Sequence, residues 1–254
     1  FYYFLKGDND VAELNNDLDF TKSHQTVLSY EYLFNKNLRF KVETYYQYLY
    51  DVPISDNYAY TSMVNHGQSD NMAWVDSLYN GGTGKNTGID ITFEKFLSKG
   101  YYFLLTTSVF DSKFKGADGI ERNTIFNGNF VLNALGGYEI NLSKNLILDF
   151  NIRSVYAGGK RYVPINLDES IAQDRWVSDE ERAYVDQLND YFRLDVRVGL
   201  VIQTKRFTHE IGFDITNLTG HENEYYRYYD RESQSIMTAY QQGFFPMGLY
   251  RIRF

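Results

Sequence analysis

The side chains best suited to chemistry are scattered in this sequence. The four histidines are His24, His66, His209 and His221, and no two of them stand at the spacing of a metal site. No Gly-x-Ser-x-Gly segment is present that would place a serine nucleophile on a sharp turn. We therefore expect neither a catalytic residue nor a metal site nor a cofactor, and we do not expect an enzyme.

Two further patterns have weak chemical readings. The segment 81–85, Gly-Gly-Thr-Gly-Lys, is similar to a phosphate-binding loop. It lacks the spacing between the glycines and precedes a strand pattern, so we interpret it as a flexible loop end. Acidic runs at 8–10, 168–169 and 179–181 offer oxygen ligands for calcium. No spaced ligand set is visible in them, which favours solvated loop charge.

Aromatic and basic side chains in predicted loops are the candidates for meeting a ligand. Aromatic rings stack on sugars or peptide groups, but they also pack loops against each other, and for most of these rings we favour packing. The candidate substrate-facing loop residues are Trp74, Tyr79, Arg161, Trp176 and Tyr225.

These residues lie between segments whose apolar side chains alternate with polar ones, as in β-strands with two different faces. The segments are 24–34, 38–50, 85–97, 101–112, 124–140, 145–157, 190–204, 208–217 and 242–254. Most exceed the roughly 5–6 residues of an ordinary strand and approach the roughly 9–11 that cross a bilayer at a tilt.

The alternation assigns each strand a lipid face and a lumen face. The predicted lipid-facing residues include Leu148, Phe150, Ile152, Val196, Val198 and Phe213. The candidate lumen-facing residues are Asp149, Arg153, Arg193, Asp195, Arg197 and Asp214. The charged set could contact a plug or a substrate, or its members could neutralise one another across the strands.

Short turns and long loops alternate along the chain. The turns are 35–37, 97–100, 141–145 and 204–207, whereas the connections 51–82, 113–123, 157–189 and 217–240 are mostly long. Short turns on one rim and long loops on the other are typical of an outer-membrane β-barrel. We therefore predict an all-β protein, an antiparallel transmembrane β-barrel. Its long loops would be extracellular, and its C-terminus would be periplasmic.

The composition agrees with this class. The 254 residues include 24 Tyr and 19 Phe, enough for aromatic girdles at both membrane interfaces. No stretch is apolar and long enough for a membrane helix, which a barrel does not need. The net charge of −8 argues against a nucleic-acid partner, and the absence of Cys excludes a disulfide scaffold. The same composition also fits an alternative to the barrel, a soluble, aromatic-rich, carbohydrate-binding β-protein.

Several stretches, in order, resemble the C-terminal barrel region of TonB-dependent receptors from Bacteroidota. They are 21–24, 43–53, 84–90, 94–102, 122–129, 156–165, 191–195, 214–219 and 243–254. The resemblance implies an outer-membrane active transporter of a nutrient, with a plug inside the barrel. The implied partners are outer-membrane lipid and lipopolysaccharide and the TonB complex through the plug region, with a surface lipoprotein as a further candidate. The short motif at 76–78 resembles a Bacteroidota O-glycosylation sequon and leaves open whether Ser77 is glycosylated.

The resemblance also sets expectations for the organisation of the chain. Residues 1–254 correspond to one C-terminal portion of a barrel, about nine or ten strands of a larger one, with the plug and the N-terminal strands absent. The count is ten if the aromatic run 1–5 ends a first strand. The alternative is a complete small outer-membrane barrel acting as an adhesin, an anchor or an enzyme. We expect Tyr250, Ile252 and Phe254 to form the assembly signal.

Overall fold

The computed structural model describes residues 4–6, 11–13, 15, 17–55, 57–65 and 77–254. Strands account for most of them. The strands are β1 (Phe4–Lys6), β2 (Val11–Glu13), β3 (Lys22–Asn35), β4 (Leu38–Ser55), β5 (Leu78–Ser98), β6 (Tyr101–Lys115), β7 (Glu121–Asn123), β8 (Phe130–Ser143), β9 (Leu146–Ala157), β10 (Tyr191–Gln203), β11 (Thr208–Thr216), β12 (Glu224–Asp230), β13 (Ser235–Tyr240) and β14 (Phe245–Arg253). The helices are α1 (Leu167–Gln173) and a 3₁₀ turn at Glu180–Arg182.

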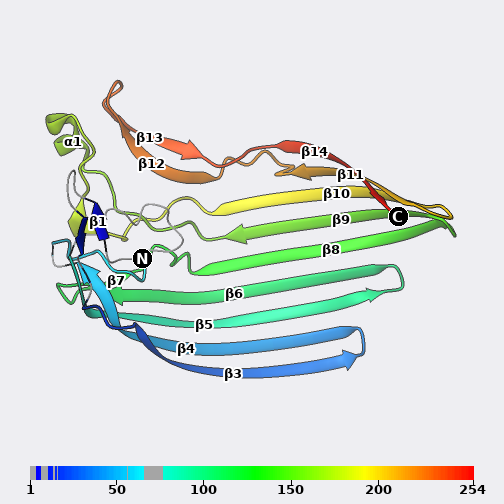
Figure 1. Cartoon of the computed structure of the whole chain (residues 1–254), viewed down its shortest axis with the longest axis horizontal. Helices are drawn as coiled ribbons and strands as arrows, with labels where there is room; N and C mark the ends of the chain where they lie inside the picture. The colour runs from blue at the N-terminus through cyan, green and yellow to red at the C-terminus, as the bar shows by residue number, and fades with distance from the viewer. Residues whose placement is uncertain (1–3, 7–10, 14, 16, 56, 66–76) are drawn as a thin grey trace.

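A single antiparallel wall dominates the structure (Figure 1). Its strands follow the order β14-β11-β10-β9-β8-β6-β5-β4-β3, and the short β7 pairs with β6 beside this path. Neighbouring strands of this path follow one another along the chain, except that the short β7 comes between β6 and β8 and the β12–β13 hairpin comes between β11 and β14. The wall is therefore a meander. This arrangement confirms the predicted all-β, antiparallel fold.

The register of the strands keeps the apolar residues on one face. Val42 lies opposite Ile91, and Val196 lies between Ile152 and Ile215. The side-chain period of a strand is two, so each of these pairs fixes the faces of its neighbours as well. The alternation seen in the sequence therefore continues as one apolar face across the whole wall.

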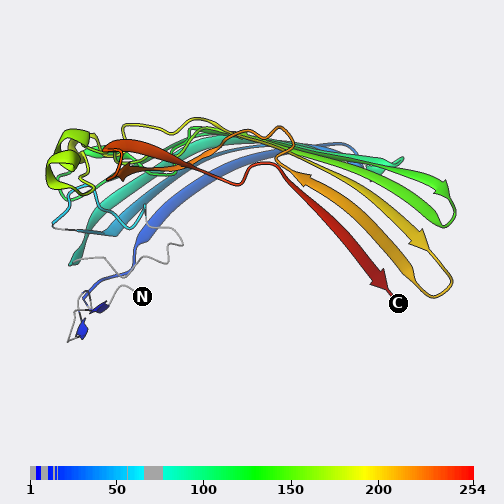
Figure 2. The same ribbon diagram turned by 90° about the horizontal axis from the view of Figure 1, so that it is seen from above.

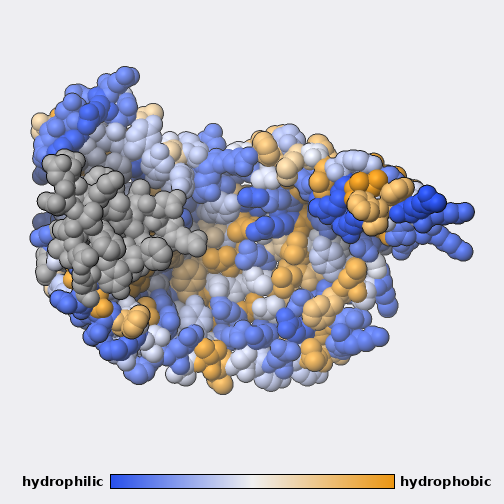
Figure 3. All heavy atoms as spheres, in the orientation of Figure 1, coloured by the Kyte–Doolittle hydropathy of each residue, from blue (hydrophilic) through white to orange (hydrophobic). Residues whose placement is uncertain are grey.

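The wall is strongly curved, as Figure 2 shows. Apolar-face side chains are often well exposed, for example Phe150 at 41% and Phe213 at 51%, whereas charged side chains of the other face are mostly half-buried. Curvature spreads side chains on the convex side and crowds them on the concave side, so the apolar face is the convex one. The hollowed face in Figure 3 is a mosaic of hydrophilic and hydrophobic residues.

Tight turns close the strands at one end. Lys99 and Gly100 both have positive φ, 55° and 81°, and they connect Ser98 to its partner Tyr101. Positive φ at both central residues is the signature of a type I′ hairpin, whose twist matches that of the strands. A turn of this kind permits only one register, which is why the two-face pattern survives from β5 into β6.

Four details differ from the sequence-based expectations. Residues 124–129 are not strand, so β8 begins at Phe130 and not at 124. Loop 217–240 contains the β12–β13 hairpin, and loop 157–189 contains α1 and the 3₁₀ turn. β5 begins at Leu78, which shortens the connection predicted at 51–82. β1 pairs with β2 in a separate small sheet, so residues 4 and 5 of the run 1–5 are not part of the wall, and residues 1–3 lie outside the described residues.

The fully buried side chains gather at the loop end of the wall. Val52, Ile54 and Phe114 are each 1% exposed, and Ala183 is 2% exposed. The wall itself is a single layer and has no partner layer in the described residues. Among the described residues, the packed core therefore lies at the loop end of the wall.

Candidate functional site: the loop cap and the inner face

The loop end of the wall is a packed body that we call the loop cap. It consists of residues 52–65 without residue 56, 113–130 and 157–190, with the β12–β13 hairpin beside them. The β4, β5 and β6 strands reach into it because they have 18, 21 and 15 residues, more than a bilayer crossing requires.

Asn127 is the centre of the cap's hydrogen bonding and is 0% exposed. Its amide nitrogen donates to Asp111 at 2.9 Å and to Asn123 at 2.8 Å, and its amide oxygen accepts from the backbone of Ser112 at 3.1 Å. A buried amide is stable only when its donors and acceptors are satisfied, and here they are. Asn127 thereby replaces the strand pairing that the sequence predicted at this position.

Arg161 ties two segments of the cap together. Its guanidinium donates to the carbonyl of Asn127 at 3.0 Å, the carbonyl of Val185 at 2.9 Å and the side-chain oxygen of Asn129 at 3.2 Å. Its backbone N–H donates to Ile125. Arg161, expected among the substrate-facing residues, thus has a guanidinium occupied by protein acceptors.

The glycines next to Arg161 allow this contact. A Cβ at Gly158 would lie 1.8 Å from the carbonyl oxygen of Gly128, and one at Gly159 would lie 2.0 Å from that of Leu188. Only a residue without a side chain permits such backbone approach. The segment Gly158-Gly159-Lys160-Arg161 therefore combines close packing with a cationic hydrogen-bond donor.

An aromatic cluster fills the cap beside this network. The Tyr184 ring meets the rings of Phe114 and Tyr60, with centroids 5.7 and 6.5 Å apart, and Tyr60 in turn meets Tyr58 at 6.3 Å. Tyr184 has φ of 61°, an uncommon conformation for a bulky residue, which the packing of its ring sustains. Burial raises the pKa of Tyr60 to about 12, with Glu180 adding to the rise.

The hairpin is attached to the cap through polar contacts. Arg227 donates to the Tyr162 hydroxyl at 2.9 Å, and Asn189 donates to Glu224 at 2.9 Å. Tyr225 and Tyr226 remain exposed at 56% and 50%, with their ring centroids 5.2 Å apart. The hairpin therefore adds an aromatic surface to the outside of the cap.

The other predicted loop residues have different surroundings. Trp176 is exposed and its indole N–H donates to Ser178 at 2.9 Å. Tyr79 is exposed on β5, with its ring over Gly81. Trp74 lies outside the described residues. The four described candidates, Tyr79, Arg161, Trp176 and Tyr225, thus have different surroundings.

The six charged candidates for the lumen share the face opposite the apolar one. Asp195 lies opposite Arg153, and Arg197 lies opposite Asp214. Their ion pairs run along a strand as well as across strands: Arg193 contacts Asp195 at 2.7 Å on β10 itself, and Arg197 contacts Asp214 at 3.1 Å. Asp149 accepts from Asn151 at 2.7 Å.

Glu210 is a further charged residue of this face that was not among the sequence-predicted candidates. It accepts from Arg197 at 2.9 Å, from Arg251 at 3.2 Å and from Arg253 at 3.0 Å, and so links β10, β11 and β14. In the alternating pattern of 208–217, Glu210 lies on the face opposite Ile211 and Phe213, and this position could have indicated it from the sequence. The inner face is therefore an internally paired network near its turn end.

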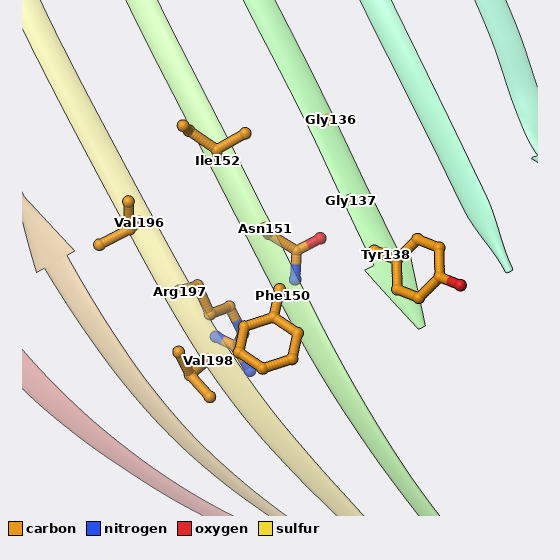
Figure 4. Close-up of a pocket in the computed structure, with 9 residues that line it drawn as sticks. All are labelled: Gly136, Gly137, Tyr138, Phe150, Asn151, Ile152, Val196, Arg197 and Val198. Carbon is orange, nitrogen blue, oxygen red and sulfur yellow. The ribbon is translucent and has the colours of Figure 1, made fainter. Parts of the chain in front are cut away.

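One shallow groove interrupts the apolar face. It has a volume of about 450 Å³ and lies where Gly136 lacks a side chain between Phe103 and Ile152. Figure 4 shows Tyr138, Phe150, Val196 and Val198 around the bare backbone there.

The structure allows a search for metal ligands in the part of the chain that it describes. Among the residues that it describes, no group of three or more His, Asp, Glu or Cys side chains is placed to hold an ion. Nor does any described helix have the length and apolar character needed to cross a membrane.

Two solved structures share the fold. The ferric yersiniabactin uptake receptor FyuA from Yersinia pestis matches with a TM-score of 0.60 and 16% identity, over 91% of this chain and 30% of its own. The outer membrane transporter YddB from Escherichia coli matches with a TM-score of 0.54 and 13% identity, over 92% of this chain and 33% of its own. The chain thus spans about a third of either structure. No protein-family model and no curated protein matches the sequence.

Proposed function

We propose that this chain, which has the fold of an outer-membrane β-barrel wall, forms part of the barrel wall and the extracellular loops of a TonB-dependent transporter that imports a nutrient. In this proposal the short turns face the periplasm, the loop cap faces the outside, and residues 1–254 are one C-terminal portion of the barrel. The TonB complex would act through a plug region that these residues do not include.

The direction of the two edge strands carries the proposal. The path from β3 to β14 contains nine strands, and every neighbouring pair in it is antiparallel. The first and ninth strands therefore run the same way, toward the turn end, and they would close the wall only as a parallel pair. Outer-membrane barrels of bacteria have antiparallel strands in even number.

The unpaired edges require further strands. In the described residues β3 pairs only with β4, and β14 pairs only with β11, so each has a free row of N–H and C=O groups. Such a row is not tolerated in a bilayer. An odd number of additional strands would satisfy both edges, which favours a larger barrel over the alternative of a complete small one.

The transport proposal can be tested in the intact organism. The strain carrying the full-length gene should grow on a panel of sole nutrient sources, and its deletion strain should lose growth on at least one. Loss of the energising inner-membrane complex should reproduce the same defect. Normal growth on that nutrient by a strain that has the gene but lacks the complex would contradict TonB dependence.

The orientation has its own test, since the chain contains no cysteine. A cysteine in place of Glu232, in the tip of the β12–β13 hairpin, should react with a membrane-impermeant maleimide in intact cells. A cysteine in place of Lys144, in the β8–β9 turn, should react only after the outer membrane is opened. The opposite pattern would reverse the proposed orientation.

A further inference from the structure

The turn end of the wall has a charge pattern that differs from the rest of the chain. Each of the four turns that link neighbouring wall strands contains at least one cation and no carboxylate; the cations are Lys36, Lys99, Lys144, Lys205 and Arg206. All five are exposed, and none forms an ion pair within the described residues. The whole chain carries −8, so this rim is positive on an acidic protein.

Exposed apolar side chains accompany these cations. Phe34 precedes the first turn and is 55% exposed, and Leu142 precedes Lys144 and is also 55% exposed. Leu97 and Phe207 flank the other two turns and are likewise exposed. An apolar residue beside an exposed cation suits the boundary between acyl chains and headgroups, where the apolar part is buried and the charge meets phosphate.

One hollow at this rim brings both features together. It lies between the β3–β4 and β5–β6 turns, has a volume of about 490 Å³, and is lined by Lys36, Lys95 and Lys99. Its apolar lining includes Leu38, Phe93, Tyr101 and Phe103, and it contains no carboxylate. The volume is in the range of about 300–1,000 Å³ found for small-molecule sites.

Lys95 shows how the hollow is built. It occupies an apolar-face position, between Leu38 and Phe103 in the cross-strand register. Its ammonium turns toward the rim and donates to Ser98 Oγ at 2.8 Å and to the carbonyls of Ser98 and Tyr101 at 2.9 and 2.8 Å. The charge is held 3.6 Å from the Tyr101 ring centroid, and no described carboxylate neutralises it. The protein thus fixes a cation at the edge of an apolar surface.

We propose that this hollow binds an anionic phospholipid: the phosphate headgroup lies among Lys36, Lys95 and Lys99, and an acyl chain lies along Leu38, Phe93 and Phe103. The occupant is argued from complementarity: the three cations form no ion pair among the described residues and would attract an anion, and the adjoining apolar lining fits an acyl chain. The inference rests on the proposed function, since it places this face in the bilayer.

Fluorescence quenching in vesicles tests the proposal on the full-length protein. A tryptophan replaces Leu38 in a background without other tryptophans. Two kinds of phosphatidylcholine vesicle are compared: in one the brominated acyl chains are on added phosphatidylglycerol, and in the other they are on phosphatidylcholine. We expect brominated phosphatidylglycerol to quench this tryptophan preferentially. Each lysine near an anionic surface contributes about 1 kcal/mol, roughly fivefold in affinity. In the Lys36→Gln/Lys99→Gln variant the preference should therefore fall roughly 25-fold or vanish.

Three controls separate the outcomes. The Lys144→Gln/Lys205→Gln variant removes two rim cations outside the hollow and should keep the preference. Phe150→Trp should be quenched by either brominated lipid; no quenching there means that the wall is not in the bilayer, which contradicts the proposed function itself. Quenching of Phe150→Trp without a phosphatidylglycerol preference at Leu38→Trp overturns only the lipid site.

Two further arms exclude other occupants. Inorganic phosphate at millimolar concentration should not relieve the quenching; if it does, the hollow binds a free anion and the acyl-chain part of the proposal is wrong. If the rim lysines instead cross-link to an acidic periplasmic protein and phosphatidylglycerol shows no preference, the surface binds protein and the lipid proposal is overturned.

Discussion

Replacing Arg161 by alanine should loosen the loop cap without affecting the wall. The change removes three hydrogen bonds from one guanidinium, at 2.9, 3.0 and 3.2 Å, and leaves the buried carbonyl of Asn127 without this donor. A hydrogen bond to a charged group contributes about 1.5–3 kcal/mol, and bonds that share one group are not additive. We therefore expect the substitution to lower the free energy of local cap opening by about 3 kcal/mol.

Hydrogen exchange measures this opening directly. About 3 kcal/mol corresponds to a roughly 100-fold faster exchange of the amides that close only when the cap is closed. The Leu188 N–H, bonded to the Lys160 carbonyl, and the Tyr184 N–H, bonded to the Tyr162 carbonyl, report the effect. Amides of β9 and β10 should not change, because their ladder is independent of Arg161.

The matched control is Arg175→Ala in the same loop. Arg175 is exposed, and its side-chain hydrogen bonds go to Gln173 alone. The Arg175→Ala substitution removes the same charge but no contact with the 123–130 segment. Amide exchange at Leu188 should therefore stay as in the parent protein. Equal acceleration in both variants, or no acceleration in Arg161→Ala, would show that the guanidinium does not hold the cap.

Four other changes test separate parts of the structure. Gly158→Ala should open the same cap amides, because its Cβ would lie 1.8 Å from the Gly128 carbonyl oxygen, whereas Gly243→Ala meets nothing and should be silent in the same exchange experiment. Phe150→Arg should lower the free energy of unfolding in vesicles by roughly 2–4 kcal/mol and Phe207→Arg at the rim by about 0–1 kcal/mol; equal costs in denaturant titrations would contradict the face assignment. The pKa of Tyr60, about 12, exceeds its unfolded value of 10.0, so the stability contributed by its neutral phenol is complete below pH 10 and is lost as the pH rises toward 12. Exchange of the cap amides followed over that interval should show this loss, and Tyr60→Phe should lessen it. Deletion of Phe254, which is fully exposed, should lower the amount of folded protein in the outer membrane while synthesis stays constant; surface labelling at the parental level would refute its role as an assembly signal.

Period-two alternation predicted the wall well because one face of it is uniformly apolar. β9 and β10 were expected at 145–157 and 190–204 and are found at Leu146–Ala157 and Tyr191–Gln203. The same rule failed at 124–129, where Phe126-Asn127-Gly128-Asn129 also alternates. The Asn-Gly-Asn order is turn chemistry, since these residues favour non-strand backbone and local hydrogen bonds. That signal competed with the alternation and decided the structure.

The cap could not be predicted from the same signals. Arg161 and Asn127 are 34 residues apart, and nothing in their local sequence indicates that they meet. The β12–β13 hairpin was hidden because Tyr225, Tyr226, Tyr228 and Tyr229 form a nearly continuous aromatic run, which hides the period of two. Loop contacts depend on which backbone segments approach closely, and only the structure shows those approaches.

The two halves of the cap are held by different kinds of contact, and this difference bears on how a ligand would be received. Segments 123–130 and 157–161 are joined by backbone approach at Gly128 and Gly158 and by the Arg161 guanidinium, contacts that a small shift would break. The hairpin is joined by side chains instead, chiefly Asn189 to Glu224 and Arg227 to Tyr162. Side-chain contacts of this kind can exchange partners while the backbone stays paired. We therefore expect the hairpin, with its exposed tyrosines, to change its contacts more readily than the glycine–arginine junction, whose close backbone approach leaves no alternative arrangement.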